Sequence, residues 1–268
     1  MPEGDTVWRA ARELDRVLTG QRLVHCDLRV PALATVDLTG REVTGVISRG
    51  KHLLIRVEGG FTLHSHLGMD GSWRIRAAGE RRRGGPEHQL RAVLGTAAHT
   101  VLGYRLPTLE LLRTAEEDSV VGHLGPDPLG PDWDPAEATR RLLAEPGRAV
   151  GEALLDQRNL AGVGNVYKSE LCFLLRVTPW LPVDRVPRPE RMASLAGKLL
   201  EVNKARTARI TTADRRPDHH LWVYGRAGRP CRRCGTAIAV AGQGPPGWER
   251  PAYWCPGCQT GPEPEGPV

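Results

Sequence analysis

The chain has 268 residues, and its 37 lysines and arginines against 31 aspartates and glutamates give a formal net charge of +6 at pH 7. No segment approaches the roughly 18 consecutive apolar residues that a membrane-spanning helix needs, so we expect no membrane partner. The length allows two packed domains. The basic balance suits a polyanion such as nucleic acid, although a soluble protein can be basic without such a partner.

The start of the chain lacks the pattern of a secretory signal. It reads Met-Pro-Glu-Gly-Asp, with no basic stretch followed by an apolar one. We therefore expect the protein to stay in the cytoplasm. The chain has six cysteines, and in that reducing compartment a disulfide framework is not expected.

An amphipathic helix is predicted directly after the first five residues, because Val7, Ala10, Leu14 and Val17 recur at helical spacing and Gly20 can end it. Short runs typical of strands follow at residues 22–30, 42–48, 52–57, 61–67, 72–75, 90–95 and 100–106. So many short, closely spaced strands predict a β-sandwich or barrel with the first helix packed on it.

The composition changes after residue 114. Residues 115–134 are rich in Gly, Pro, Asp and Glu and predict a linker. Beyond it, apolar residues at helical spacing predict helices at 136–144, 150–157, 166–175 and 191–205. Pro, Gly and Glu dominate residues 261–268, which predicts a disordered tail.

Four cysteines near the C-terminus form two Cys-x2-Cys pairs, Cys231 with Cys234 and Cys255 with Cys258. Four thiolates at this spacing close a tetrahedral structural zinc site that has no open position for catalysis. A redox role is the alternative, but it needs only one pair and usually a βαβ context. We therefore predict one structural zinc ion that holds a small hairpin, on which Arg250 is the obvious side chain to be presented.

A second motif, Gly162-Val-Gly164-Asn165, precedes an amphipathic helix. Its glycines allow a close backbone approach, Asn165 can cap the helix, and the N–H groups at the helix start can bind phosphate. An ordinary helix–helix turn is the alternative. The motif is not a dinucleotide-binding fingerprint, because no strand precedes it and the third glycine is missing.

The N-terminus offers a nucleophile. Removal of the initiator methionine, which is normal before a small residue, leaves Pro2 with a free secondary amine. An α-amine has a pKa of about 8 against about 10.4 for lysine, so more of it is neutral and able to attack an electrophilic carbon. Glu3 can act beside it as a general acid or base. A frayed terminus without function is the commonest alternative.

Lys51 is predicted at the tip of a hairpin, in the tight turn Arg49-Gly-Lys51-His52. A lysine in a turn is usually just solvated. In a DNA-binding protein it can also contact a phosphate or transfer a proton, and composition does not choose between these roles.

Together these motifs resemble the formamidopyrimidine-DNA glycosylase / endonuclease VIII family. The shared words are Met-Pro-Glu-Gly at the start, Arg-Gly-Lys51, Leu155-Asp-Gln157 followed by Gly162-Val-Gly164-Asn165, and Arg250-Pro-Ala-Tyr-Trp-Cys255-Pro-Gly-Cys258-Gln259, in that order. They span nearly the whole chain. The resemblance implies an α+β multidomain fold: an N-terminal β-sandwich with a packed helix at 1–114, a linker at 115–134, a helix–two-turn–helix domain at 135–222, a zinc-finger hairpin at 223–260 and a tail at 261–268.

The resemblance also implies the roles of individual residues. Pro2 is expected to be the Schiff-base nucleophile, Glu3 to assist base departure and sugar-ring opening, and Lys51 to donate a proton in β-elimination and contact phosphate. Asn165 matches a phosphate-binding residue. Arg250 matches an arginine that grips the phosphates beside the lesion and assists δ-elimination.

Three further residues are expected to contact DNA. Met69 fits an apolar wedge that fills the gap left by an extruded base, although its neighbours Gly68 and Asp70 are not the usual partners in endonuclease VIII. His123 lies where endonuclease VIII has a DNA-contacting arginine. Lys168, one turn into the helix after Asn165, is the third.

The expected function is that of a base-excision repair enzyme, a DNA glycosylase and abasic-site lyase that acts as a monomer on damaged double-stranded DNA in the cytoplasm and nucleoid. The start and end of the chain resemble endonuclease VIII, and the Arg-x-Phe loop of the purine-directed branch is missing near residues 102–106, so we expect oxidised pyrimidines as substrates. An oxidised-purine glycosylase and a non-catalytic DNA-binding relative are the alternatives. Activity on single-stranded or bubble DNA is left open.

Overall fold

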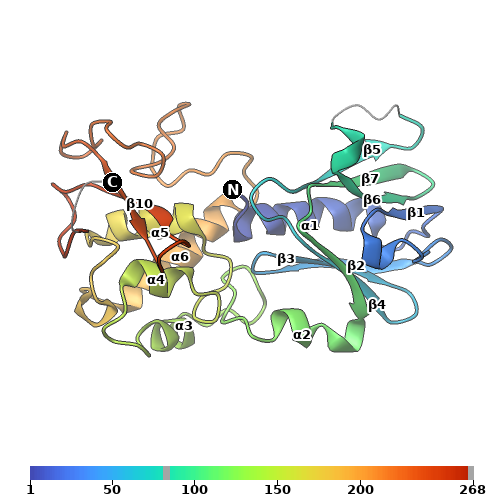
Figure 1. The fold of residues 1–268 in the computed structure, drawn as a ribbon, viewed down its shortest axis with the longest axis horizontal. Coiled ribbons are helices and arrows are strands. Elements are labelled where there is room, and N and C mark those ends of the chain that lie inside the picture. Colours follow the sequence, from blue (N-terminus) through green and yellow to red (C-terminus); the bar gives the residue numbers. More distant parts are fainter. Residues whose placement is uncertain (81–84, 265–268) are drawn as a thin grey trace. The chain divides into compact units, whose positions relative to one another are not determined.

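The computed structural model describes residues 1–80 and 85–264, and the chain divides into two compact units, Met1–His123 and Leu124–Val268 (Figure 1). The division falls within residues 115–134, which the sequence predicts as a linker. This stretch is not entirely irregular, because it contains the short helix α2 (Asp118–Val121).

The first unit contains two four-stranded antiparallel sheets and helix α1 (Gly4–Leu18). One sheet has the order β2-β3-β4-β8 and the other the order β1-β6-β7-β5. The predicted β-sandwich with a packed helix is therefore confirmed. The strands are β1 (His25–Leu28), β2 (Val43–Arg49), β3 (His52–Val57), β4 (Phe61–His66), β5 (Ser72–Ala77), β6 (Leu90–Gly95), β7 (His99–Tyr104) and β8 (Thr108–Arg113).

Helix α1 is held in the core of this unit along its whole length. Val7, Leu14 and Leu18 are at most 1% exposed and belong to the main apolar cluster, and the helix packs on β2 and β3. The backbone N–H groups of Thr6 and Val7 donate to the Glu3 carbonyl at 2.9 and 3.0 Å. The helix therefore begins directly after Glu3, so its packing orders the chain up to its first residues.

The sheet β2-β3-β4-β8 has one apolar face and one polar face. Leu53 and Ile55 of β3 point into the main core. Residues directly opposite in an antiparallel ladder share a face, and the alternate residues pair with one another on the other face. These pairs are His52 with His66, Leu54 with His64, Arg56 with Thr62, and His64 with Glu110.

Glu117 covers one end of this polar face. The Arg56 guanidinium donates to both of its carboxylate oxygens, at 2.8 and 2.6 Å, and the Thr62 hydroxyl donates to one of them at 2.7 Å. Burial raises the pKa of Glu117, but these hydrogen bonds and the charge of Arg56 outweigh it, so its pKa lies below the ordinary value. The segment that contains α2 is thereby anchored to the sheet.

The second unit contains the predicted helices and a C-terminal hairpin. The helices are α3 (Pro135–Leu142), α4 (Val150–Leu155), α5 (Asn165–Leu175) and α6 (Glu190–Asn203), and the hairpin is formed by β9 (Ala239–Gln243) and β10 (Arg250–Trp254). The Asp134 side chain caps α3 by accepting from two N–H groups of its first turn. Among the described residues, no helix has the length and apolar character to cross a membrane.

Glu170 joins α5 to the segment that leads into the hairpin. It is fully buried, and its carboxylate accepts from the N–H groups of Trp222, Val223 and Tyr224 at 2.8–2.9 Å and from the Thr211 hydroxyl. Burial raises the pKa of Glu170, and the four hydrogen bonds oppose this shift. A buried carboxylate with so many donors holds its surroundings in one arrangement.

Part of the segment predicted as a disordered tail is described and packs on the second unit. The Thr178 hydroxyl donates to the Pro262 carbonyl at 2.6 Å, and the Trp254 indole donates to Glu263 at 3.3 Å. Residues 265–268 lie outside the described residues.

Candidate functional site

Pro2 and Glu3 lie at the N-terminal end of α1. Pro2 is half-buried and Glu3 is fully buried. The first turn of a helix carries a partial positive charge, because its N–H groups have no partner within the helix. Pro2 therefore adjoins both a helix N-terminus and the buried Glu3 side chain.

Lys51 lies in the two-residue turn between β2 and β3, where the sequence predicts it. Arg49 pairs with His52 across this turn, and Gly50 has φ +57°. Two-residue hairpin turns need positive φ at their first central position, which glycine adopts without strain. Gly50 therefore allows the sharp turn that presents Lys51 beside the polar face of the sheet.

Four histidines gather next to this turn. His52 Nδ1 lies 2.8 Å from His64 Nε2, and His64 Nδ1 lies 2.7 Å from Glu110 Oε1. The rings of His66 and His123 lie 5.4 and 6.2 Å from the His52 ring, centroid to centroid. The chain Glu110–His64–His52 thus runs from an exposed carboxylate through a buried imidazole to the residue that follows Lys51.

The hydrogen bonds of this cluster restrict which ring nitrogens carry hydrogen. An ionised Glu110 only accepts, so His64 Nδ1 donates to it. When His64 is neutral, its Nε2 accepts from His52 Nδ1–H. Burial, followed by the positive charges of the other histidines and Lys51, lowers the pKa of His52 to about 3. A neutral His52 in this arrangement keeps a lone pair on Nε2.

His66 is restricted in the opposite sense. Its Nδ1 accepts from the Gly68 N–H at 2.9 Å, so a neutral His66 carries its hydrogen on Nε2. Burial lowers the pKa of His66, and the charge of Lys51 acts in the same direction. Sequence reasoning missed these histidines as functional candidates. The available signal was the alternation of His64 and His66 in a strand next to one that starts at His52.

Met69 lies in the turn between β4 and β5 and is 61% exposed. Gly68 before it has φ +56°, and a Cβ at Gly68 would lie 2.7 Å from the Pro107 ring. The turn therefore requires glycine there. The exposure of Met69 is compatible with the wedge role that the sequence suggests, and this role stays a prediction.

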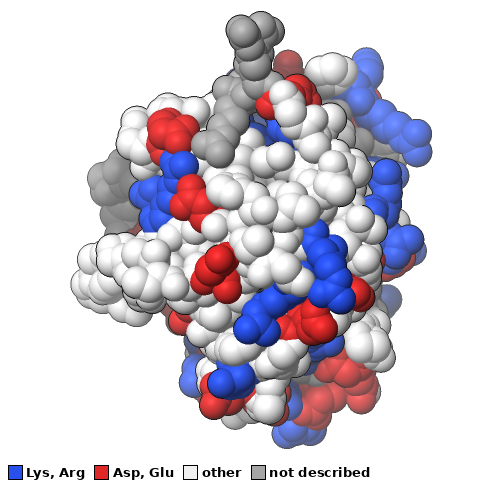
Figure 2. Space-filling model, turned by 90° about the vertical axis from the view of Figure 1, so that its right-hand side faces the viewer, with Lys and Arg blue, Asp and Glu red and all other residues white. Residues whose placement is uncertain are grey.

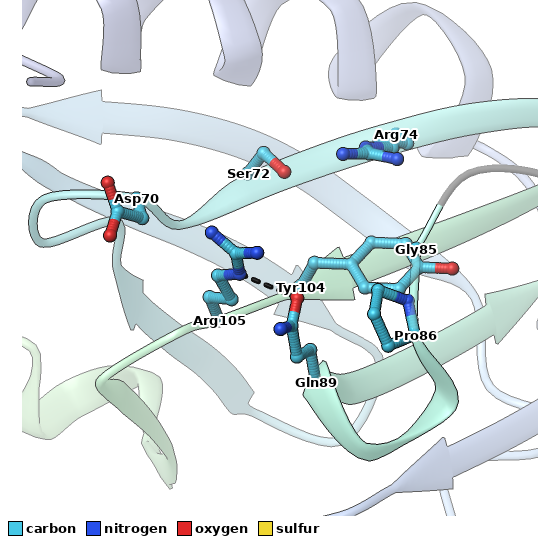
Figure 3. Close-up of a pocket in the computed structure, with 8 residues that line it drawn as sticks. All are labelled: Asp70, Ser72, Arg74, Gly85, Pro86, Gln89, Tyr104 and Arg105. Carbon is cyan, nitrogen blue, oxygen red and sulfur yellow. Dashed lines mark hydrogen bonds between the residues drawn. The ribbon is translucent and has the colours of Figure 1, made fainter.

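A polar pocket lies beside this turn, and sequence reasoning did not identify it (Figure 3). Arg105 donates from Nε to Gln89 Oε1 at 2.6 Å, and its φ of +49° is unusual for a residue other than glycine. The residues that line the pocket are Asp70, Ser72, Arg74, Gly85, Pro86, Gln89, Tyr104 and Arg105.

On the face drawn in Figure 2, Lys and Arg side chains form separate groups interspersed with Asp and Glu, rather than one basic patch.

Asn165 and Lys168 lie on α5 and are fully buried. The Asn165 side chain donates from Nδ2 to the Pro251 carbonyl at 2.8 Å, and its Oδ1 finds no hydrogen-bond partner within the described parts of the chain. Asn165 is the first residue of α5, after Gly164. N–H groups at the start of a helix can bind phosphate, and for α5 this role stays a prediction. Burial of Lys168 does not favour a direct DNA contact, and that role stays a prediction.

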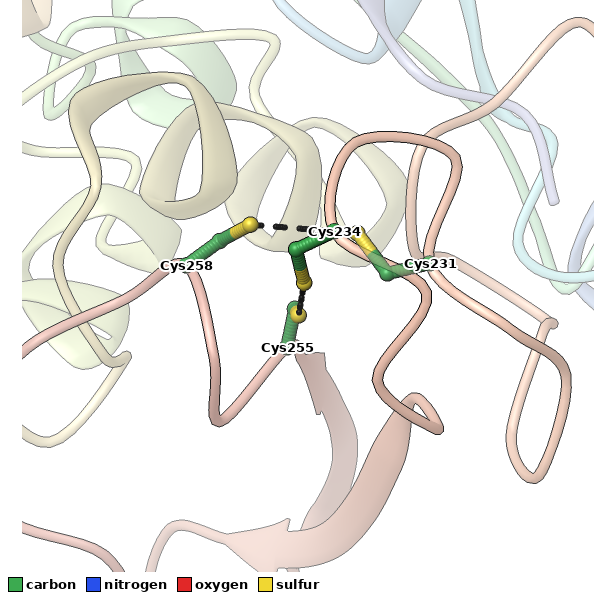
Figure 4. Close-up of side chains that lie close together, drawn as sticks. All are labelled: Cys231, Cys234, Cys255 and Cys258. Carbon is green, nitrogen blue, oxygen red and sulfur yellow. Dashed lines mark hydrogen bonds between the residues drawn. The ribbon is translucent and has the colours of Figure 1, made fainter.

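The four paired cysteines converge at the base of the β9–β10 hairpin (Figure 4). Their sulfur atoms all lie within 4.8 Å of one another, with Cys234 Sγ 3.4 Å from Cys255 Sγ and Cys231 Sγ 3.9 Å from Cys258 Sγ. A tetrahedral site with metal–sulfur bonds of about 2.3 Å requires sulfur separations of about 3.8 Å. This donor set therefore fits one metal ion with no open position.

Arg250, the first residue of β10, is exposed and pairs with Gln243. Because Pro251 follows it and accepts from Asn165, the start of α5 and the start of β10 are joined by a direct hydrogen bond. The predicted residues thus form two groups. Pro2, Glu3, Lys51, Met69 and His123 belong to the first unit, and Asn165, Lys168, Arg250 and the cysteines belong to the second.

Two family models match the chain, one for each unit. Residues 1–107 match the formamidopyrimidine-DNA glycosylase N-terminal domain, and residues 124–209 match the formamidopyrimidine-DNA glycosylase H2TH domain. The two matches cover most of both units, and the second contains α3 to α6.

Curated relatives align over nearly the whole length. The chain is 65% identical over 266 residues to the probable endonuclease 8 2 of Streptomyces coelicolor, covering 98% of this chain and 96% of that one. It is 50% identical over 260 residues to the DNA-(apurinic or apyrimidinic site) lyase Nei2 of Mycolicibacterium smegmatis, covering 97% and 99%. It is 34% identical over 269 residues to the endonuclease 8 of Escherichia coli, covering 97% and 100%.

Solved structures share the fold. The Lactococcus lactis Fpg bound to DNA that contains an oxidised pyrimidine superposes with a TM-score of 0.80 at 23% identity, covering 97% of this chain and 100% of that one. The same protein bound to DNA with an abasic site gives 0.79 at 23% identity, with the same coverage. At this identity the likeness establishes the arrangement of the elements.

The histidine chain makes a direct prediction for NMR. His52 should remain neutral from pH 8 down to about pH 4, because its pKa lies at about 3. In 15N-labelled protein at pH 7.5, His52 should show a protonated Nδ1 and an Nε2 without hydrogen, the same tautomer that the arrangement gives to neutral His64, and the His52 signal should vanish in His52→Asn. A His52 signal that titrates with a midpoint near pH 6 would contradict the arrangement.

Proposed function

Because this chain belongs to the formamidopyrimidine-DNA glycosylase / endonuclease VIII family, we propose that it excises oxidised pyrimidines from double-stranded DNA and cleaves the resulting abasic strand by β,δ-elimination. The near full-length relatives named endonuclease 8 and abasic-site lyase support both activities. The observation that carries the proposal is the ordered N-terminus, with Pro2 directly before the buried Glu3 at the start of α1.

The chemistry starts at the Pro2 amine once Met1 has been removed. Its nitrogen bonds to C1′ of the damaged nucleotide, the bond from C1′ to the base breaks, and the base leaves with a proton. Opening of the sugar ring then gives an iminium, since the amine is secondary. Glu3 adjoins Pro2 in sequence and serves as the acid–base group for these proton transfers.

Strand cleavage follows from the iminium. Loss of a proton from C2′ breaks the bond from C3′ to its phosphate oxygen, and a second elimination breaks the bond from C5′ to its phosphate oxygen. Water then hydrolyses the iminium, which releases the unsaturated sugar fragment and restores the Pro2 amine. Lys51 donates a proton during the first elimination and contacts the departing phosphate. The product is a one-nucleotide gap with phosphate at both ends.

The second unit grips the DNA backbone in this proposal. Arg250 is exposed, and the start of α5 lies next to it through the Asn165–Pro251 hydrogen bond. A guanidinium and the N–H groups of a helix start are both strong phosphate donors. Phosphate contacts fix the register of the DNA without reading its sequence, which suits an enzyme that searches for lesions.

We propose that the four-cysteine cluster holds one zinc ion with a structural role. Cys231, Cys234, Cys255 and Cys258 supply four sulfur ligands at suitable separations and leave no position for a substrate. When bound, the ion cross-links the two ends of the hairpin segment. The chain itself then presents Arg250 at a fixed place.

Metal analysis tests this role. The protein should contain about one zinc per chain. Cys255→Ser should lose the metal and weaken DNA binding by at least about ten-fold, because Arg250 is no longer held in place. Cys172→Ser, which changes a cysteine outside the cluster, should keep the zinc. Full metal content in Cys255→Ser would contradict the ligand assignment.

Trapping tests the nucleophile. Borohydride should link the protein covalently to DNA that contains an abasic site, because it reduces an iminium to a stable amine. A stable N-terminal tag should abolish trapping and incision, whereas a C-terminal tag should preserve both. A non-catalytic DNA-binding relative would give no adduct.

Glu3→Gln refines the same test, since it should lower base excision by about 100-fold or more while retaining cleavage at preformed abasic sites. Undiminished incision by the N-tagged protein would eliminate Pro2 as the nucleophile.

The pyrimidine preference follows from how the lesions stack. Thymine glycol and dihydrouracil have lost ring aromaticity and stack poorly, so extruding them should cost less than the few kcal/mol of a normal base. An oxidised guanine still stacks and pairs, and it demands specific polar recognition and a well-filled gap. Met69 is the exposed apolar side chain available as a wedge here. The Arg-x-Phe loop of the purine-directed branch is missing.

Single-turnover rates on matched duplexes decide between the two lesion classes. We expect thymine glycol and dihydrouracil to be released faster than 8-oxoguanine opposite cytosine. An identical duplex with a preformed abasic site serves as the control, because it measures the lyase step alone. Fastest release of 8-oxoguanine would overturn the pyrimidine preference and leave the roles of Pro2, Glu3 and Lys51 intact.

A further inference from the structure

The tip of the β9–β10 hairpin is a defined turn. The Trp248 N–H donates to the Pro245 carbonyl at 2.9 Å, and Gly247 has φ +82°. Pro246 at the second position and a glycine with positive φ at the third are the signature of a type II turn. The Gly247 N–H also donates to the Glu249 carboxylate at 2.8 Å. The backbone that carries Trp248 is therefore stiff before any ligand binds.

Trp248 is the most exposed of the seven tryptophans. It is 82% exposed, whereas the other six of the seven tryptophans are half-buried or buried. The indoles of Trp73, Trp222 and Trp254 each donate a hydrogen bond. Within the described residues, the Trp248 side chain makes no hydrogen bond and no ring contact. Such exposure leaves most of a large apolar surface, about 200 Å² for an aromatic of this kind, in water.

The surroundings of Trp248 suit a nucleobase better than a protein surface. Stable protein interfaces need about 800 Å² on each partner, yet no other large apolar side chain among the described residues of the hairpin is exposed. One indole face matches one base. Arg250 lies two residues further on and is exposed, and two residues of extended chain span about 7 Å. The acidic neighbour Glu249 is engaged by the Gly247 N–H.

We propose that Trp248 is a stacking platform for an unpaired base next to the nucleotide whose phosphate Arg250 binds. An aromatic face accepts any base, so the contact is sequence-tolerant, and a cation beside it holds the backbone. Bases paired within a duplex already stack on their neighbours, so the contact gains most on single-stranded or bubble DNA. This inference rests on the proposed function, because it takes the hairpin as a DNA-binding element.

Affinity measurements on three forms of one oligonucleotide test the proposal. The probe carries a tetrahydrofuran abasic analogue and a fluorescein label, as a single strand, as a bubble and as a perfect duplex. Trp248→Ala should bind the single strand and the bubble about ten-fold more weakly and the duplex less than three-fold more weakly. Trp248→Phe should stay within about three-fold of the wild-type protein on all three forms, because it keeps an aromatic face.

Val202→Ala is the matched control, since Val202 is an exposed apolar residue of the same unit on α6 and is 45% exposed. It should bind all three DNA forms like the wild-type protein. Trp248 fluorescence gives a second readout: quenching by an eight-residue oligothymidine should be smaller in Trp248→Phe than in the wild-type protein. Wild-type affinity of Trp248→Ala for all three forms, or an equal loss on all three, would overturn the proposal.

Incision of a thymine glycol duplex by the wild-type protein is measured separately. Absent incision together with the selective loss of single-strand binding would defeat the proposed function and retain the stacking platform. Normal incision with no selective loss would retain the proposed function and defeat the platform.

Discussion

The packing of α1 into the core of the first unit is the constraint on which the proposed chemistry depends. Chain termini commonly fray, and a frayed amine spends little time in any reactive position. Here Leu14 and Leu18 anchor the helix, and the helix begins directly after a fully buried Glu3. Pro2 therefore has a fixed neighbour on its C-terminal side. A nucleophile on an internal side chain is held in place by its own strand or helix. Pro2 lies at the chain terminus, and the packing of α1 into the core holds it in place instead.

The sheet β2-β3-β4-β8 performs two tasks because its side chains alternate between two faces. Leu53 and Ile55 build the apolar core, and the residues between them build a polar surface. That surface contains the Arg56–Glu117 ion pair at one end and the histidine chain at the other. Both are held by strand register, so a slip of one residue would lose the core and the polar surface together.

Local patterns in the sequence predicted most of the fold and the main chemical groups. The seven predicted strands and the five predicted helices are present with shifted ends, because apolar periodicity reports which face of an element is buried. Strand β8 was not among the predicted strands, although Leu109, Glu110 and Leu111 alternate between apolar and polar as in a half-buried strand. The Glu110 carboxylate is hydrogen-bonded to His64, which is 46 residues away in the sequence, and only the pairing of the strands brings the two side chains together. The sequence alone contains no signal for such a pair.

The same limit applies to individual side chains. Lysine usually lies at the surface of a protein, but α5 is buried on nearly all sides. The spacing of its apolar residues therefore did not predict that Lys168 is buried. Trp248 lies between the two cysteine pairs in a stretch rich in Gly and Pro, where a tryptophan is equally compatible with a buried position. The type II turn that exposes it depends on a backbone hydrogen bond and the φ of Gly247.

The hydrogen bond from Asn165 to the Pro251 carbonyl has a consequence for how the second unit would bind DNA in the proposed function. It connects the start of α5 to the strand that begins at Arg250, and Glu170 ties the same helix to residues 222–224. In the proposed function both of these places bind phosphates, and the hydrogen bonds between them keep their separation nearly constant. The second unit would then fit best a DNA backbone in which two phosphates lie at that separation. A damaged strand that bends easily would reach this spacing at a lower energetic cost, before any base is inspected.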